Sequence, residues 1–251
     1  MIIYTVGMGP GAEDLIAPRA LAAISDSEVV VGYSNYLSLY PAELWAGKEL
    51  VSTGMTGEIE RCKKAIEFAL QEKVVSVISS GDSGVYAMAG LIMELVDAQD
   101  LNIEVKVIPG ITASVAAASV LGAPLMNDFA TISLSDLMTS KEVIKNRLSL
   151  VAEADMVCVL YNPASKKRRD LIQYAIDIFK KCRGDNGLVA IVNHATRPDE
   201  EVIISNLSEF KFEKVGMSST VIIGASNTIH KNGKFYTLRG YSDKYESAIN
   251  G

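Results

Sequence analysis

The stretch Val74–Val85 reads VVSVISSGDSGV and joins an apolar run to a loop rich in glycine and serine. Its first half, Val74–Ser79, is a short β-branched run, which is typical of a buried strand. The loop Ser80–Gly84 follows, and Val85–Val96 then continues as an apolar stretch that predicts a helix. A strand that enters a glycine loop and then a helix is the repeating unit of α/β proteins. Such proteins bind ligands at the carboxyl ends of their strands.

The same alternation of strand and helix extends over the chain in both directions. The runs that predict strands are Ile2–Val6, Val29–Val31, Val74–Ser79, Ile103–Ile108, Ala130–Ser133, Met156–Leu160, Leu188–Val192 and Thr220–Gly224. The stretches that predict helices are Glu58–Glu72, Val85–Val96, Thr112–Leu121, Ser140–Ala152 and Lys166–Lys181. This pattern predicts an α/β fold with largely parallel sheets covered by helices.

A break at Gly122-Ala123-Pro124 predicts the division into domains, because glycine and proline interrupt a long apolar stretch there. We expect an N-terminal α/β domain of residues 1–122 and a C-terminal α/β domain of residues 123–251, with a cleft between them. The turn Asn232-Gly233 before Lys234–Leu238 predicts a hairpin near the end of the chain.

Composition limits the classes of protein that this chain can be. Its 251 residues are 49% hydrophobic and 22% charged, which is typical of a globular protein. A net charge of −6 disfavours a nucleic-acid partner. No apolar run reaches the roughly 18 to 20 residues that span a bilayer, and Met1–Val6 looks like a strand rather than a signal peptide. The three cysteines lie far apart, which predicts a cytoplasmic protein without a disulfide framework or a metal site.

The first glycine loop, Gly7–Ala12, formally fits the dinucleotide fingerprint G-x-G-x-x-A. Pro10 contradicts that interpretation, because it removes a backbone N–H from the loop that would hold a pyrophosphate. The carboxylate expected at the end of the second strand is also missing, since the chain has Val31-Gly32-Tyr33 there. A nucleotide-dependent oxidoreductase is therefore disfavoured. Taken alone, the glycines are explained equally well by a tight turn.

The second glycine loop allows a structural and a functional interpretation. Asp82 or Ser83 could cap the helix predicted from Val85, which would account for both residue types. The loop could instead bind a ligand, because it leads from a strand end into a helix. A third strand end repeats the arrangement in Pro109–Ser114. Two such loops from neighbouring units can face one another across one crevice.

Three of these segments together resemble a known family. Gly7–Gly11, Ser80–Tyr86 and Pro109–Ala113 occur in the order and at the spacing of the tetrapyrrole (corrin/porphyrin) methyltransferases. The resemblance implies two α/β domains with S-adenosylmethionine bound between them.

Further segments resemble the branch of the family that methylates C17 of precorrin-3B or cobalt-factor III and contracts the ring. These segments are Gly122–Leu125, Asp128-Phe129, Ile132–Leu137, Leu160–Pro163, Ser165–Arg169 and Thr220–Gly224. The resemblance covers the chain from residue 3 to about residue 241 and implies an enzyme of cobalamin biosynthesis.

The resemblance also implies the residues of the site. Cofactor contacts are expected at Pro10, Gly81, Asp82, Ser83, Tyr86, Thr112, Ala113, Tyr161, Asn162, Asn193, Ala195, Ser219 and Thr220. Substrate contacts are expected at Gly9, Ser133, Ser135, Lys166, Arg168, Arg169 and Arg197. The chain departs from the family where Gly81-Asp82-Ser83 replaces Gly-Asp-Pro, and where Asn127 replaces a frequent histidine.

Methyl transfer to carbon needs in-line approach and exclusion of water more than it needs a strong acid or base. The titrating candidates for a proton transfer are Asp82, Asp128, Asp136 and His194. For each of them, a role as a cap, in a turn or at the surface explains the residue type as well.

The basic run Lys166–Arg169 follows Ser165, which resembles a helix N-cap. Four cations would then lie in the first helical turn, where the helix dipole disfavours them. A substrate with several carboxylates would offset that cost, and Arg197 could add a further contact. The alternative is an ordinary solvated face.

Three other functions stay open at this point: methylation of C11 or C20 by a sibling enzyme, RNA 2′-O-methylation, and a non-catalytic S-adenosylmethionine-binding module. The acidic charge argues against RNA. A homodimer is implied by the resemblance alone.

Overall fold

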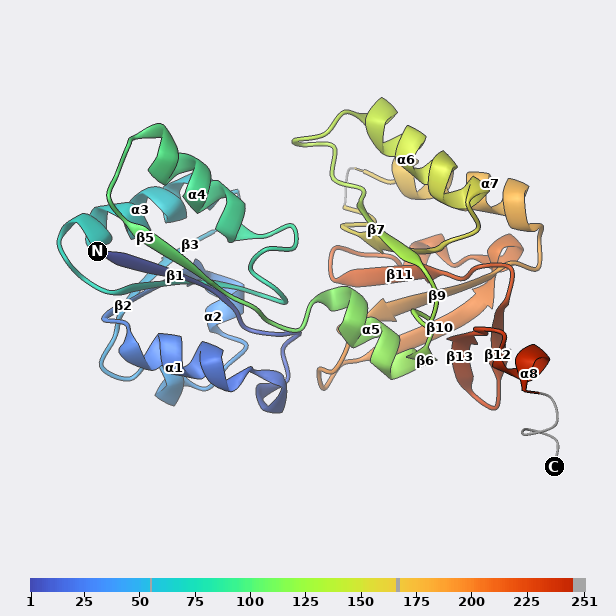
Figure 1. The fold of residues 1–251 in the computed structure, drawn as a ribbon, viewed down its shortest axis with the longest axis horizontal. Coiled ribbons are helices and arrows are strands. Elements are labelled where there is room, and N and C mark those ends of the chain that lie inside the picture. Colours follow the sequence, from blue (N-terminus) through green and yellow to red (C-terminus); the bar gives the residue numbers. More distant parts are fainter. Residues whose placement is uncertain (55, 166–167, 246–251) are drawn as a thin grey trace. The chain divides into compact units, whose positions relative to one another are not determined.

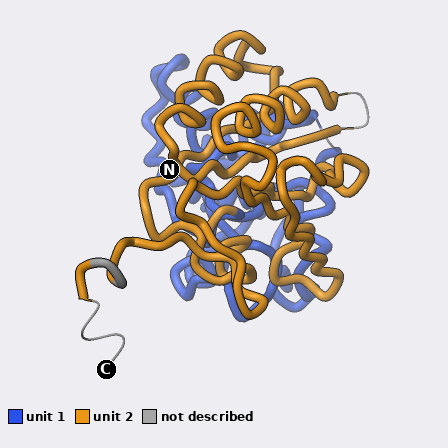
Figure 2. The backbone as a smooth tube through the Cα atoms, turned by 90° about the vertical axis from the view of Figure 1, so that its right-hand side faces the viewer, with its two compact units in different colours: residues 1–113 blue, residues 114–251 orange. Residues whose placement is uncertain are grey.

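The computed structural model describes residues 1–54, 56–165 and 168–245 of the chain. The chain folds into two compact units, Met1–Ala113 and Ser114–Gly251, which are coloured separately in Figure 2. The helix α5 (Ala113–Leu121) packs through Ala117, Ala118 and Leu121 on the sheet of the second unit. The domain boundary expected after Gly122 stays a prediction. Within the described ranges, none of the helices has the length and apolar character needed to cross a membrane.

The first unit is a sheet of five parallel strands in the order β3-β2-β4-β1-β5 (Figure 1). The strands are β1 (Ile2–Gly7), β2 (Val29–Tyr33), β3 (Glu49–Thr53), β4 (Val75–Ser79) and β5 (Glu104–Ile108). The helices are α1 (Pro18–Asp26), α2 (Ser34–Leu37), α3 (Glu58–Leu70) and α4 (Met88–Ala98). The sequence did not predict β3, because this edge strand buries little apolar surface.

Neighbouring residues of the central strands alternate between two cores. Val29, Val31, Val75 and Val77 pack with α3 and α4 on one face of the sheet. Their neighbours, such as Ile78, pack with α1 and with Tyr40 and Trp45 on the other face. Because both faces are covered, the strands are continuous apolar runs, as is usual for parallel sheets.

The second unit contains a five-stranded sheet in the order β10-β9-β11-β8-β7 and a small three-stranded sheet, β12-β13-β6 (Figure 1). The strands are β6 (Gly122–Ala123), β7 (Phe129–Ser133), β8 (Val157–Tyr161), β9 (Leu188–Asn193), β10 (Glu201–Asn206), β11 (Ser219–Ile223), β12 (Thr228–Lys231) and β13 (Lys234–Thr237). Besides α5, the helices are α6 (Lys141–Glu153), α7 (Asp170–Arg183) and α8 (Tyr241–Lys244).

The expectation of a largely parallel sheet is wrong for this unit. Among the described strands of its five-stranded sheet, only β7 and β8 pair in parallel, whereas β11 pairs antiparallel with β8 and β9, and β9 pairs antiparallel with β10. The segments between β9, β10 and β11 contain 3-10 turns but no long crossover helix, and antiparallel strands need only a short connection. The α/β fold class is nevertheless confirmed, because α6 and α7 pack on one face of the sheet. The predicted hairpin is confirmed as β12 and β13, with positive φ at Asn232 and Gly233.

Candidate functional site

Three loops meet at one edge of the first sheet. They follow β1, β4 and β5, which are adjacent and parallel, so their carboxyl ends lie side by side. The first two loops are joined by backbone hydrogen bonds: Gly9 N–H donates to Gly81 O at 3.0 Å, and Gly81 N–H donates to Gly9 O at 2.7 Å. Met8 N–H donates to Ser79 O at 2.9 Å. This edge is therefore built from main chain.

The glycines of these loops are required by close packing. A Cβ atom on Gly110 would lie 2.2 Å from Gly81 O and 2.6 Å from the carbonyl of Gly7. A Cβ atom on Gly7 would lie 2.6 Å from Gly110 N. Backbone atoms cannot move aside as a flexible side chain can, so residues with a Cβ do not fit at either position.

Asp82 joins the second loop to the third. One carboxylate oxygen accepts from Gly84 N–H at 2.8 Å, and the other accepts from Gly110 N–H at 2.9 Å. Ser83 is fully buried and donates through Oγ to Ile108 O at 3.1 Å. The capping interpretation is wrong, because α4 begins at Met88 and its N-cap is Ala87. Asp82 and Ser83 instead hold the loops together.

The other predicted residues of the first unit lie in the same three loops. A Cβ atom on Gly81, whose φ is +71°, would approach Thr112 Cα and Ala113 N only to 3.7 Å. Pro10 is buried, and Tyr86 is 55% exposed. Tyr86 has a φ of 52°, a left-handed conformation that residues other than glycine seldom adopt. The structure thus brings the predicted residues of this unit to one edge.

A second polar cluster lies at an edge of the larger sheet of the second unit. Ser133 ends β7 opposite Tyr161, which ends β8, and Asn193 ends β9 opposite Ser219, which begins β11. Asn162 Nδ2 donates to Ser133 Oγ at 3.0 Å. Tyr161 OH accepts from the backbone N–H of Ser114 at 2.8 Å. Predicted residues from four separate segments therefore share this edge. The remaining predicted residues lie near the same strands. Ala195 and Arg197 follow Asn193 in the chain, and Thr220 is buried on β11. The backbone N–H of Ser135 donates to Ser133 Oγ at 3.3 Å.

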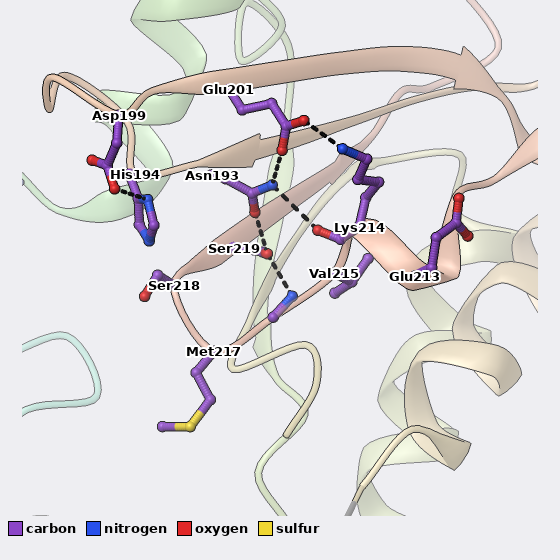
Figure 3. Close-up of a pocket in the computed structure, with 11 residues that line it drawn as sticks. Asn193, His194, Asp199, Glu201, Glu213, Lys214, Val215, Met217, Ser218 and Ser219 are labelled. Carbon is purple, nitrogen blue, oxygen red and sulfur yellow. Dashed lines mark hydrogen bonds and ion pairs between the residues drawn. The ribbon is translucent and has the colours of Figure 1, made fainter. Parts of the chain in front are cut away.

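Asn193 is the centre of a hydrogen-bond network in a pocket of about 510 Å³ (Figure 3). Its Nδ2 donates to Glu201 Oε2 at 3.0 Å and to Lys214 O at 3.2 Å. Its Oδ1 accepts from Ser219 Oγ. Lys214 Nζ forms an ion pair with Glu201 Oε1 at 2.8 Å. Hydrogen bonds from Lys214 and Asn193 lower the pKa of Glu201, and Glu201 raises the pKa of Lys214.

Two of the four titrating candidates do not lie free at this edge. Asp128 precedes β7 and so lies at the opposite end of that strand from Ser133. Asp136 pairs with Arg168 at 3.2 Å. The third, Asp82, is bonded to two amides of the first unit. The fourth, His194, lines the pocket of Figure 3, and its Nδ1 lies 2.6 Å from Asp199 Oδ2.

The interpretation of the basic run as the first turn of a helix is wrong. The helix α7 begins at Asp170, and Ser165 and Arg168 instead exchange backbone hydrogen bonds. Arg169 donates to the carbonyl oxygens of Phe212 at 2.7 Å and Val215 at 3.3 Å. Arg169 is the N-cap of α7 and Arg168 precedes it, so neither arginine lies in the first helical turn. Lys166 and Lys167 lie outside the described residues.

Three residues of the pocket were not predicted from the sequence: Asp199, Glu201 and Lys214. Glu201 lies opposite Asn193 in the register of β9 and β10. The β-branched run Val202–Ile204 was a signal for this strand. A hairpin predicted there would have placed Glu201 beside Asn193. Lys214 carries no local signal, because it reaches Glu201 from a 3-10 turn before β11.

Comparison with known proteins identifies the relatives of this chain. The family model Tetrapyrrole (Corrin/Porphyrin) Methylases matches residues 2–211. A relative from Salmonella typhimurium, named probable cobalt-factor III C(17)-methyltransferase, is 44% identical over 241 residues, which are 96% of this chain and 100% of the relative.

Solved structures share the fold. The crystal structure of the methyltransferase CobJ has a TM-score of 0.89 at 32% sequence identity. The match covers 94% of this chain and 99% of the CobJ chain. A uroporphyrin-III C-methyl transferase from Thermus thermophilus, complexed with S-adenyl homocysteine, has a TM-score of 0.68 at 22% identity, covering 89% of this chain and 97% of that one.

Proposed function

The chain belongs to the tetrapyrrole (corrin/porphyrin) methylases, and we propose that it transfers a methyl group from S-adenosylmethionine to C17 of cobalt-factor III or precorrin-3B, with ring contraction, in cobalamin biosynthesis. The observation that carries the proposal is the match to a C17-methyltransferase over the whole length of that relative. The intact loops of the first unit support it, because they supply a place where a cofactor can reach the main chain.

The residues of the first unit fit S-adenosylmethionine. Gly81 carries no side chain, and a Cβ atom there would meet nothing closer than 3.7 Å, so a ligand has room to approach the backbone at this position. Ser79 Oγ, at the end of β4, is buried and has no hydrogen-bond partner among the described residues. A buried polar atom of this kind is usually bonded, so a ligand or a water is expected there. Bound S-adenosylmethionine supplies a methyl group already activated as a sulfonium.

The protein's own contribution is to bind and orient. Asp82 keeps two loops in register through two hydrogen bonds, so the cofactor loops are ordered before a ligand arrives. In the second unit, Arg169 bonds two backbone carbonyls, whereas Arg168 bonds Asp136 Oδ1 at 3.2 Å and Asn162 O at 3.3 Å. We assign the recognition of substrate carboxylates to Arg168, because it already binds a carboxylate that a substrate carboxylate would replace. The cofactor contacts expected of Tyr161, Asn162, Asn193, Ala195, Ser219 and Thr220 stay predictions.

Incubation with S-adenosylmethionine and each tetrapyrrole tests the proposal, with the product analysed by mass spectrometry and NMR. We expect a product heavier by one methyl group, with the new methyl signal at C17. A methyl signal at C11 or C20 would instead indicate a sibling activity. Binding of S-adenosylmethionine in calorimetry without any product would indicate a non-catalytic module, and binding of NAD or ATP alone would contradict the cofactor.

We further propose that the enzyme acts in the cytoplasm as a homodimer. Light scattering after size-exclusion chromatography tests the assembly: twice the mass of the 251-residue chain is expected, and a monomer at micromolar concentration would contradict it.

A further inference from the structure

The imidazole of His194 is held by a carboxylate inside the pocket of the second unit. His194 Nδ1 lies 2.6 Å from Asp199 Oδ2, and the two side chains are 34% and 66% exposed (Figure 3). A carboxylate at Nδ1 favours the tautomer with its proton on that nitrogen. The lone pair of the neutral ring then lies on Nε2, which is on the far side of the ring from Asp199.

The backbone that carries His194 is held in a left-handed conformation by the hydrogen bonds of its loop. His194 has a φ of 50° and Thr196 a φ of 67°, both in the left-handed region that favours glycine. The loop is held by hydrogen bonds from Thr196 N–H to Glu200 Oε2 at 2.6 Å and from Arg197 N–H to His194 O at 2.9 Å. An exposed ion pair contributes little to stability. Backbone outliers that the surrounding structure holds in place are concentrated at functional sites.

The proposed reaction releases a proton. The new C17–CH3 bond takes its electron pair from the macrocycle, and the pair of the broken S–CH3 bond stays on sulfur. The macrocycle then returns to its original charge by losing one proton, whose bonding pair stays on the macrocycle. A base beside the substrate accepts that proton.

We propose that His194 Nε2 accepts this proton and that Asp199 is the positioning residue for the imidazole. The inference rests on the proposed function. The other charged groups of the pocket are Glu201, Glu213 and Lys214. Hydrogen bonds from Lys214 and Asn193 lower the pKa of Glu201, which makes it a weak base, and Lys214 already carries its proton. Glu213 is also a carboxylate, and carboxylates as a class are weaker bases than imidazole.

The variant His194→Asn tests the assignment, because asparagine tolerates a left-handed φ and leaves the loop intact. We expect kcat to fall about 100-fold or more. KM and the affinity for S-adenosylmethionine should stay within about twofold if only proton transfer is lost. The wild-type rate should fall as the pH is lowered, since the base must be neutral, and His194→Asn should lose this acid limb. Asp199→Asn should lower kcat about 10-fold and keep the limb.

His230, the other histidine of the chain, provides a matched control. It is exposed on β12, outside the residues that line the pocket, and His230→Asn should leave kcat and the pH profile unchanged. With two histidines, the imidazole NMR signals are assigned by the two variants. Addition of the tetrapyrrole without S-adenosylmethionine should shift the His194 signals and not those of His230.

An active wild type together with a His194→Asn variant of equal kcat and equal pH profile would overturn the inference. Unshifted His194 signals in the presence of bound tetrapyrrole would also overturn it. Lack of methyl transfer by the wild type would instead overturn the proposed function on which the inference rests. A melting temperature measured for each variant identifies any loss of fold.

Discussion

The polar edges of the two sheets differ in the groups that form them: main chain in the first unit and side chains in the second. In the first unit, Gly7, Gly81 and Gly110 bring main chain against main chain, and Asp82 joins the loops. In the second unit, a network of side chains around Asn193 makes the edge. The close-packed main chain excludes an added Cβ at Gly7 and Gly110, and its amide groups do not titrate. A side-chain site accepts substitutions of similar shape and responds to pH.

The sharpest test of this difference is Gly110→Ala. The added Cβ atom would lie 2.2 Å from Gly81 O, and three backbone segments would have to move. We expect the free energy of unfolding to fall by about 3 kcal/mol or more, and the affinity for S-adenosylmethionine to fall with it. Denaturant unfolding and calorimetry measure the two effects.

Gly90→Ala is the matched control for an added methyl group. Gly90 lies in α4, and nothing lies within 4 Å of an added Cβ. Alanine should raise the free energy of unfolding by up to about 1 kcal/mol, because glycine is a poor helix former. A Gly110→Ala variant as stable as the wild type would refute the description of the first edge as closely packed main chain.

Replacement of Asp82 tests whether its carboxylate organises the cofactor loops. Asp82→Ala leaves the Gly110 N–H without its acceptor at 2.9 Å. We expect a loss of about 2 kcal/mol in the free energy of unfolding and a weaker affinity for S-adenosylmethionine in calorimetry. Lower stability at unchanged cofactor affinity would restrict Asp82 to a structural role.

Ser140→Ala is the control for a lost cap. Ser140 accepts a hydrogen bond from Val143 N–H at the start of α6. Its replacement should cost about 1 kcal/mol of stability and leave cofactor affinity unchanged.

Separate replacement of Arg168 and Arg169 tests whether one arginine binds substrate while the other stabilises the fold. Arg168→Gln should weaken tetrapyrrole binding by about 1.5 kcal/mol, the value of a charge-assisted hydrogen bond, and more so at low salt. Arg169→Gln should lower the melting temperature and spare substrate affinity, because Arg169 bonds the carbonyls of Phe212 and Val215. Substrate titrations and thermal melts of both variants measure the two effects. Equal substrate affinity for both variants and the wild type would contradict the binding of substrate carboxylates by Arg168.

The smallest expected effect concerns pH and the network at Asn193. The pKa of Glu201 lies below its ordinary value of 4.5, because Lys214 and Asn193 bond its charged form. The ionised carboxylate therefore stabilises the fold above pH 4.5, and this contribution is lost as the pH falls through the lowered pKa. Glu201→Gln should melt slightly below the wild type at pH 7, and the difference should narrow as the pH falls below 4.5.

Glu49→Gln is the control for removal of an exposed ion pair, since Glu49 pairs with Lys73 at 2.7 Å in the first unit. Melting curves of both variants from pH 3 to pH 8 make the comparison. A difference between Glu201→Gln and the wild type that does not narrow as the pH falls below 4.5 would exclude ionisation of Glu201 as its cause.

Elements with a local signal are predictable from this sequence. The central strands of the first unit are continuous apolar runs, and the turn Asn232-Gly233 marks the hairpin between β12 and β13. The predicted starts of α4 and α7 are wrong, because Asp82, Ser83 and Ser165 resemble caps but bond elsewhere. Residues of these types cap helices and join loops with the same atoms, and only the position of a partner distinguishes the two roles.

The sequence by itself determined the α/β class, the three glycine loops at the strand ends and the family, because each depends on residues that are neighbours in the chain or on their order. Only the tertiary structure decided the antiparallel direction of β9 to β11 and the hydrogen bond from Gly110 N–H to Asp82. The same holds for the pairing of His194 with Asp199 and of Glu201 with Lys214. Those features depend on distances between separate segments. A hydrogen bond or ion pair forms only within about 3 to 4 Å, and the spacing of residues along a chain does not specify which segments the fold brings that close.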